Sequence, residues 1–210
     1  KTLGFKGDDK FGFSFNAETT SKLLVFATNG RFYTIDASKL PGGRGFGEPI
    51  SLMVDMEGAE IVGVQPFTGG RKFIVASKSG NGFVVKEDDC LANTRKGKQV
   101  LNVKAPDVAA AFGISEGDHV ATVGENRKMV IFPLKDLPEM GRGKGVRLQR
   151  FKDGGLSDAK TFTLAEGLTW IDKAGRTHTV AKSDLRDWLG SRADAGRLAP
   201  KGFPESNTFK

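Results

Sequence analysis

Basic side chains recur in short glycine-rich loops of this chain, and these loops are its clearest chemical signal. The densest stretch runs from Gly141 to Lys152 and holds five basic residues and no acidic one. Lys and Arg neutralise phosphate groups, and glycine lets the main chain come close to them. The pattern therefore favours contact with a polyanion backbone such as that of duplex DNA. An ordinary solvated surface is the alternative.

The predicted DNA contacts lie in these loops and in the turns before them. They are Arg31, Arg44, Arg95, Lys96, Lys98, Arg127, Lys128, Arg142, Lys144, Arg147, Arg150, Arg176 and Arg192. We expect the strongest contact from the loop Gly141–Gly145 and the residues just after it, in the third repeat unit. There, period-two alternation in a strand would put Arg147 and Arg150 on opposite faces, which favours Arg147 because it is nearer the loop.

The overall charge agrees with this interpretation but is weaker evidence. Lys and Arg together number 32 against 25 for Asp and Glu, which gives a net charge of +7. The isoelectric point calculated from the sequence is near 9.5. Many proteins carry such an excess without binding nucleic acid, so the placement of the charges matters more than their sum.

The residue types that usually perform catalysis are few and isolated. Tyr33 is the only tyrosine and follows Phe32 in an apolar run, so we expect it to be structural. His119 and His178 lack the Cys or carboxylate spacing of a metal site, and Cys90 has no partner for a disulfide. Gly141–Gly145 lacks the spacing of an ATPase phosphate loop and the Ser or Thr that follows it. The sequence therefore predicts no catalytic residue, no metal and no cofactor in this segment.

A repeated unit must position the basic loops. Each copy has an apolar strand, a turn, a second strand, and a segment that leads into the loop. The turns are at Gly30, Gly80, Asn126 and Gly175, which are 50, 46 and 49 positions apart. Glycine, and to a lesser degree asparagine, adopts the positive φ that a tight hairpin turn requires. A period near 50 with several strands in each copy indicates a propeller-like ring of small antiparallel sheets.

We therefore expect one all-β domain over residues 1–210, cut from a larger polypeptide. The repeat units are 23–66, 73–113, 119–163 and 168–197, with a partial blade at 1–22 and a tail at 198–210. A short helix is predicted within 181–190, capped by Ser183 or Asp184, with Leu185, Trp188 and Leu189 on one face. Shorter helical turns are expected at 37–40 and 134–137. No apolar run suits a membrane span, and the start has no signal-peptide pattern.

Several longer motifs give the chain a resemblance to a known family. They are Asn29–Asp36, Arg44–Pro49, Gly80–Val84, Asn93–Lys98, and Met129–Pro138 followed by Gly141–Gly145. Together they make the chain similar to the C-terminal domains of the A subunits of bacterial topoisomerase IV and, more distantly, of DNA gyrase. The gyrase branch carries a Gln-Arg-Arg-Gly-Gly-Lys-Gly box. That box is absent here, which favours the topoisomerase IV branch and argues against tight chiral wrapping.

The resemblance implies a β-pinwheel of about four to five blades, in which neighbouring blades exchange strands. It implies a non-catalytic domain that bends duplex DNA along its rim and presents it to a separate cleavage core for decatenation and supercoil relaxation. The implied partners are the B subunit of topoisomerase IV, the remainder of the A subunit, which holds the core, and condensin-type chromosome-organising proteins, at the nucleoid in the cytoplasm. ATP and Mg would then act outside this segment. A gyrase-type wrapping domain and a propeller-like protein-docking module remain as alternatives.

Overall fold

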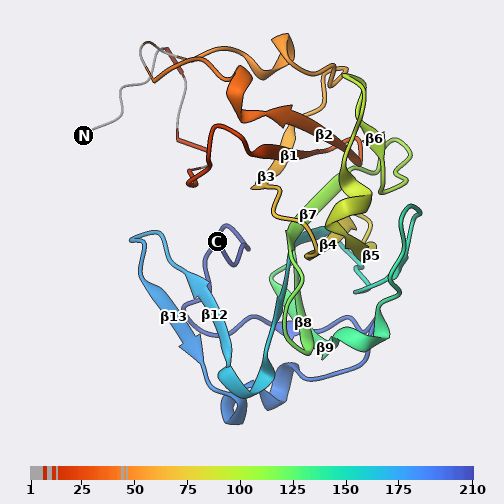
Figure 1. Cartoon of the computed structure of the whole chain (residues 1–210). Coiled ribbons are helices and arrows are strands. Elements are labelled where there is room, and N and C mark those ends of the chain that lie inside the picture. The colour runs from red at the N-terminus through yellow and green to blue at the C-terminus, as the bar shows by residue number, and fades with distance from the viewer. Residues whose placement is uncertain (1–6, 9–10, 13, 44, 46) are drawn as a thin grey trace.

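The computed structural model describes residues 7–8, 11–12, 14–43, 45 and 47–210. Within these ranges it contains three four-stranded antiparallel sheets and one two-stranded sheet, which follow one another along an arc (Figure 1). The remaining ordered elements are six 3-10 helices of three to seven residues. The predicted all-β class and the propeller-like arrangement are confirmed.

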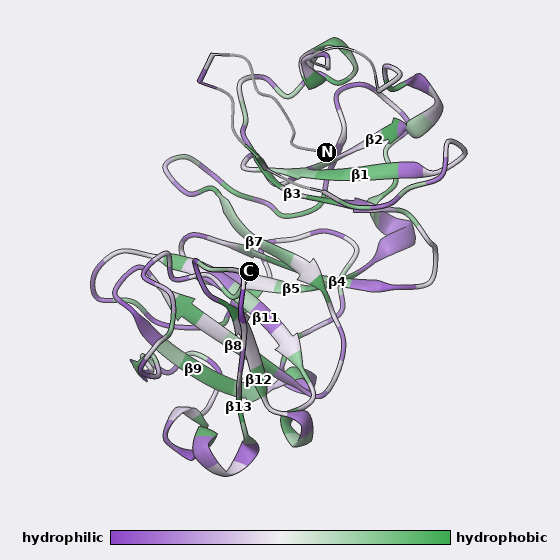
Figure 2. Ribbon diagram, turned by 90° about the vertical axis from the view of Figure 1, so that its left-hand side faces the viewer, coloured by the Kyte–Doolittle hydropathy of each residue, from purple (hydrophilic) through white to green (hydrophobic). Residues whose placement is uncertain are grey.

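Each repeat unit opens with a hairpin that forms the middle of a sheet. The hairpins are β1 (Lys22–Ala27) with β2 (Arg31–Asp36), β4 (Lys72–Ser77) with β5 (Asn81–Lys86), β8 (His119–Gly124) with β9 (Lys128–Pro133), and β12 (Leu168–Ile171) with β13 (Thr177–Val180). Most residues of the first three hairpins are buried. The second and third hairpins pack against structure on both faces, whereas the first packs against the second blade on one face and against residues 50–64 of its own unit on the other. The strands are accordingly mostly hydrophobic and the connecting loops mostly hydrophilic (Figure 2).

A third strand of each complete sheet comes from the same unit, and the fourth comes from the next one. The third strands are β3 (Ile61–Pro66), β7 (Ala109–Ile114) and β11 (Leu156–Phe162). The exchanged strands β6 (Lys98–Gln99), β10 (Val146–Arg147) and β14 (Arg197–Leu198) pair with β2, β5 and β9 of the preceding unit. The strand exchange implied by the resemblance is therefore present.

The sheet order fixes which edge of each blade faces outward. In every complete sheet, the third strand and the exchanged strand form opposite edges. Because β7 contacts both β3 and β11, those strands line the inner side of the arc. The exchanged strands and the loops that lead into them therefore lie on the outer side, as Figure 1 shows on its right for β6.

The hydrophobic core lies mainly between adjacent blades. Phe26 and Phe32 of the first blade stack on each other with ring centroids 4.6 Å apart. Phe73 and Phe112 of the second blade meet Phe32 at 6.3 and 5.4 Å. Aromatic burial of this kind is a large contribution to stability and also joins the two blades.

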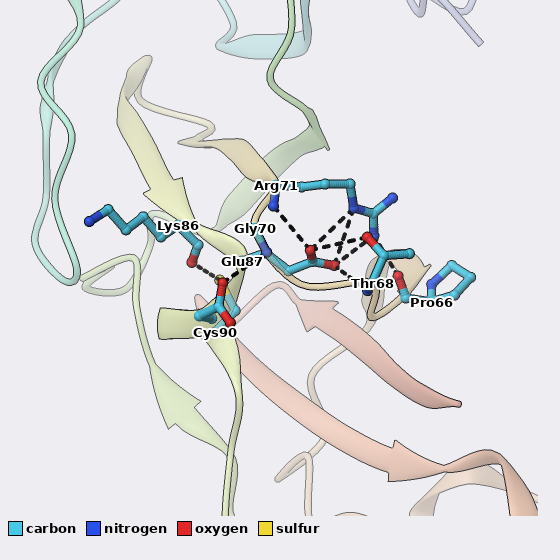
Figure 3. Close-up of polar contacts among 8 residues, drawn as sticks. Pro66, Thr68, Gly70, Arg71, Lys86, Glu87 and Cys90 are labelled. Carbon is cyan, nitrogen blue, oxygen red and sulfur yellow. Dashed lines mark hydrogen bonds and ion pairs between the residues drawn. The ribbon is translucent and has the colours of Figure 1, made fainter. Parts of the chain in front are cut away.

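The linker between the first two blades is held by a buried ion pair (Figure 3). Glu87 lies in η3 (Glu87–Cys90), has no exposed surface, and accepts a hydrogen bond of 2.6 Å from Arg71 Nη2. The same carboxylate accepts from the main-chain N–H groups of Thr68 and Arg71, and Arg71 also donates to the carbonyl of Pro66. Burial raises the pKa of Glu87, but these donors outweigh it and leave the pKa below its ordinary value.

The C-terminal segment packs back against the blades. Phe203 and Phe209 join the core of the last two units. The buried carboxylate of Asp158 accepts from the N–H of Phe209 at 2.9 Å, and Lys210 Nζ donates to the carbonyl of Phe112. Burial raises the pKa of Asp158. The end of the chain thus lies on the inner side of the arc (Figure 1).

Three local predictions need correction or completion. The positive φ in the third hairpin belongs to Arg127, at 61°, and not to Asn126. Asn126 instead accepts the N–H of Lys128 with its side-chain oxygen. The equivalent turn residues are therefore 50, 47 and 48 positions apart, at Gly30, Gly80, Arg127 and Gly175.

The predicted helix within 181–190 is a 3-10 helix, η6 (Lys182–Trp188), without a side-chain cap. Leu185 is buried, whereas Leu189 lies beyond the helix and is 40% exposed, so the predicted shared apolar face was wrong. The helical turns expected near 37 and 134 are present as η1 (Ala37–Lys39) and η4 (Leu134–Asp136). Two further short 3-10 helices are η2 (Ile50–Leu52) and η5 (Leu164–Glu166).

The partial blade predicted at 1–22 stays a prediction. Up to Ser21, the described residues contain no strand.

Candidate nucleic-acid interface

A glycine at positive φ brings each exchanged strand onto the preceding blade. Gly97, Gly145 and Gly196 have φ values of 70°, 76° and 77°. A Cβ atom at these positions would lie 2.7, 2.2 and 2.4 Å from the carbonyl oxygens of Phe32, Gly82 and Met129, in this order. No side chain fits at such distances, so these glycines dictate how closely the basic loops approach the sheet.

We call the three loops before the exchanged strands the rim loops: Asn93–Gly97, Gly141–Gly145 and Ser191–Gly196. Besides the strand pairing, the main chain of each rim loop bonds to the preceding unit. Asn102 N–H donates to Gly143 O at 2.8 Å, and Gly143 N–H donates to Val100 O at 2.9 Å. In the third rim loop, Ala193 N–H donates to Leu148 O of the preceding unit at 2.8 Å. The rim loops are thus joined to one another along the outer edge.

Five predicted contact residues extend into solvent on or beside the first two rim loops. They are exposed, and within the described part of the chain their side chains have no hydrogen-bond or ion-pair partner: Lys96, Lys98, Lys144, Arg147 and Arg150. Unpaired exposed cations keep their full charge available to a phosphate. This arrangement is suited to binding a polyanion backbone.

Three other predicted contact residues have guanidinium groups that bond within the rim. Arg95 Nη2 donates to Leu52 O at 2.8 Å, and Arg192 Nη1 donates to Arg147 O at 2.8 Å. Arg142 Nε donates to Asn102 Oδ1 at 3.3 Å. Arg95 and Arg142 are exposed and Arg192 is half-buried, and each of the three side chains already has a partner.

The predicted contacts in the hairpin turns are engaged elsewhere or only partly exposed. Arg31 donates to Lys96 O at 3.1 Å and so supports the first rim loop. Arg127 donates to Phe203 O and Pro204 O and fastens the C-terminal segment. Arg176 pairs with Asp172 at 2.8 Å. Lys128 is half-buried, and Arg44 lies outside the described residues.

The strand argument that set Arg147 apart from Arg150 does not hold. β10 contains only Val146 and Arg147, so the alternation does not extend to Arg150. Leu148 and Gln149 are buried between them, and both arginines are exposed. Lys152 is exposed as well and was left out of the predicted set, although the run of basic residues in the sequence includes it.

The residues that could have served catalysis have structural partners. Tyr33 is fully buried, and its hydroxyl accepts from Asn29 Nδ2 at 2.8 Å. Cys90 is buried in the core, and burial raises the pKa of its thiol. His119 and His178 each lie 2.8 Å from an aspartate, and His178 also stacks on Trp170. Across the described residues, no group of three or more potential metal ligands converges. No helix in the same ranges could cross a membrane.

Comparison with known proteins gives one consistent family. The family model described as "DNA gyrase C-terminal domain, beta-propeller" matches residues 21–68, 71–116 and 118–156, which are the first three units. The A subunit of DNA topoisomerase 4 from Caulobacter vibrioides is 49% identical over 99% of this chain, and that from Rickettsia conorii is 36% identical over 99%. The chain spans only 27% and 28% of the lengths of these relatives.

Solved structures agree on the fold. The E. coli ParC C-terminal domain superposes with a TM-score of 0.79 at 24% identity, over 97% of this chain and 86% of that one. A DNA gyrase A C-terminal domain gives a TM-score of 0.65 at 16% identity, over 92% of this chain and 68% of that one.

Proposed function

Because the chain belongs to the family of DNA gyrase C-terminal domains, with relatives named as A subunits of topoisomerase 4, we propose that it binds and bends duplex DNA along its outer rim. One observation carries the proposal. Exposed cations without partners recur on successive rim loops that the strand exchange holds on one side of the arc. A curved row of such cations suits a phosphate backbone that follows the arc.

The domain would perform no chemistry of its own. It would present a duplex to a cleavage core elsewhere in a topoisomerase IV assembly, for decatenation and supercoil relaxation, while ATP and Mg would act in other parts of that assembly. Condensin-type proteins are further candidate partners, and the bacterial nucleoid is the expected location. These steps rest on the family resemblance, and only the DNA contact rests on the rim itself.

The first test removes the unpaired cations of the second rim loop and the residues just after it. The variant Lys144→Ala, Arg147→Ala, Arg150→Ala should bind duplex DNA at least about tenfold more weakly at moderate salt. The slope of log affinity against log salt should fall in magnitude by about two to three, because each lost phosphate contact removes about 0.9. Fluorescence anisotropy at several salt concentrations measures both quantities.

A matched control removes equal charge outside the rim loops. Lys135→Ala, Lys182→Ala, Lys201→Ala changes three exposed lysines that lack side-chain partners among the described residues. It should change affinity less than about threefold and leave the salt slope nearly intact. Equal losses in both variants would mean that net charge alone drives binding. If the unaltered chain does not bind duplex DNA, a role in docking an acidic protein becomes the better explanation.

A further inference from the structure

One arginine in each rim loop reaches back to the preceding unit. The acceptors are Leu52 O for Arg95, Asn102 Oδ1 for Arg142 and Arg147 O for Arg192. Leu52 and Arg147 each lie three residues before a residue whose N–H donates to the rim loop, Asp55 and Arg150, whereas Asn102 is itself such a donor. The same kind of contact therefore occurs three times, although the acceptor atoms differ in type.

Main-chain hydrogen bonds accompany each of these contacts. Asp55 N–H donates to Arg95 O at 2.8 Å beside the first contact, and the pair formed by Gly143 with Val100 and Asn102 lies beside the second. Beside the third, Arg150 N–H donates to Asp194 O at 3.2 Å. A side-chain bond and at least one main-chain bond thus link every rim loop to the unit before it.

The unpaired cations lie next to these links. Lys96 follows Arg95 directly, and Lys144 is two residues after Arg142. Arg147 carries the very carbonyl that accepts from Arg192. Three of the five candidate phosphate contacts, Lys96, Lys144 and Arg147, therefore lie beside a link made by an arginine that is already bonded within the protein.

We propose that Arg95, Arg142 and Arg192 are positioning residues: they fix the spacing of the rim loops, and so the curvature of the bound duplex, instead of supplying phosphate contacts. The inference rests on the proposed DNA binding. Bending a duplex costs energy that depends on the angle imposed. Loops that could shift independently would let the DNA relax toward a straight path while the phosphate contacts remain.

The test replaces the three arginines by lysine, which keeps the charge but loses the planar fork of donors. The probe is a duplex of about 60 base pairs, well below the DNA persistence length of about 150 base pairs, with a fluorophore at each end. For Arg95→Lys, Arg142→Lys, Arg192→Lys we expect the salt slope to stay within about one unit of the unaltered chain. The binding-dependent rise in energy transfer between the duplex ends should fall by half or more.

The matched control is Arg186→Lys, Arg197→Lys. It makes the same chemical change at two exposed arginines outside the rim loops. Arg186 donates to Ser183 O within η6, and Arg197 faces Asp187 at 3.8 Å. This control should retain the energy-transfer change. An unaltered bend in the first variant would overturn the proposal. In the corresponding triple alanine variant, a salt slope reduced by two to three would also overturn it, because the three arginines would then be phosphate contacts themselves.

Amide hydrogen exchange gives a readout that needs no DNA. The N–H groups of Asp55, Gly143 and Ala193 should exchange at least about tenfold faster in the first variant and at the ordinary rate in the control. Unchanged exchange rates would contradict the positioning role of the three arginines without contradicting the proposed DNA binding. Failure of the unaltered chain to bind the duplex would overturn the proposed function instead, so the two failures can be told apart.

Discussion

Gly145 shows how much a single residue decides in this structure. Its φ is 76°, and a Cβ atom there would lie 2.2 Å from Gly82 O, a main-chain atom that cannot move aside without opening the blade. Gly145→Ala should therefore lower the free energy of unfolding by more than about 2 kcal/mol, part from the left-handed backbone and the rest from the lost docking of β10. Urea denaturation measures the change.

Gly175→Ala separates the two causes. Gly175 has nearly the same φ, 77°, but within the described residues nothing lies within 4 Å of a Cβ atom placed there. Its replacement should cost only about 1 kcal/mol. Equal costs at the two glycines would mean that the close approach to Gly82 contributes nothing.

The sequence shows which residue types lie in the rim loops but not what each side chain does. Arg127 and Arg147 look alike in the sequence, since both belong to basic runs. Arg127 bonds to Phe203 and Pro204, which are 76 and 77 positions away. Such contacts depend on where the C-terminal segment packs, and no local pattern encodes that. Which of the predicted cations are unpaired therefore could not be predicted.

At the scale of elements, the linker between the first two blades depends on Glu87. Glu87→Gln leaves Arg71 without its buried partner and should cost about 3 kcal/mol at pH 7, the low end for a broken buried pair because Arg71 is partly exposed. Since the pKa of Glu87 is lowered in the folded state, its contribution is present above the unfolded pKa of about 4.3 and is lost as the pH falls below it. The difference between the two proteins should therefore shrink in acid.

Urea denaturation at about pH 7 and about pH 3.5 measures this difference. Glu139→Gln is the control, because Glu139 pairs with Lys72 and Lys86 at a surface site where 38% of its side chain is exposed. A surface pair of this kind should contribute less than about 1 kcal/mol. If the two variants lose the same stability, the buried Arg71–Glu87 pair contributes no more than a surface ion pair.

Long strands could be predicted and exchanged strands could not. β4 and β5 are runs of apolar residues around a glycine turn, so composition alone indicates a hairpin. β6, β10 and β14 have two residues each, too few for any periodicity. Their pairing was expected only from the family resemblance. The third turn was misassigned for a related reason, since Asn is the commoner positive-φ residue and here Arg127 holds that place.

At the scale of the whole molecule, the arrangement of the rim predicts binding without base preference. Its cations lie on loops, and the longest helical element among the described residues is the seven-residue η6, too short to read a major groove. Affinities for unrelated duplexes of equal length should agree within about threefold, or roughly 0.65 kcal/mol. Competition binding measures this, and a consensus recovered from random-sequence selection would contradict it.

The strand exchange has a consequence for the order in which the molecule can be made. The edge of β5 is covered by β10 and by residues 138–140, all from the next unit. The last residue of β10, Arg147, follows Lys86 by about 60 positions, and at 5–20 residues per second a ribosome needs roughly 3–12 s to add them. During synthesis a blade therefore cannot be completed until the next unit has been made. Until then, the outer strand of the newest hairpin has an unpaired edge. A pause in that interval would leave the edge open to strands of neighbouring nascent chains. The rate of translation between β5 and β10 thus sets how long this strand edge stays unpaired in the nascent chain.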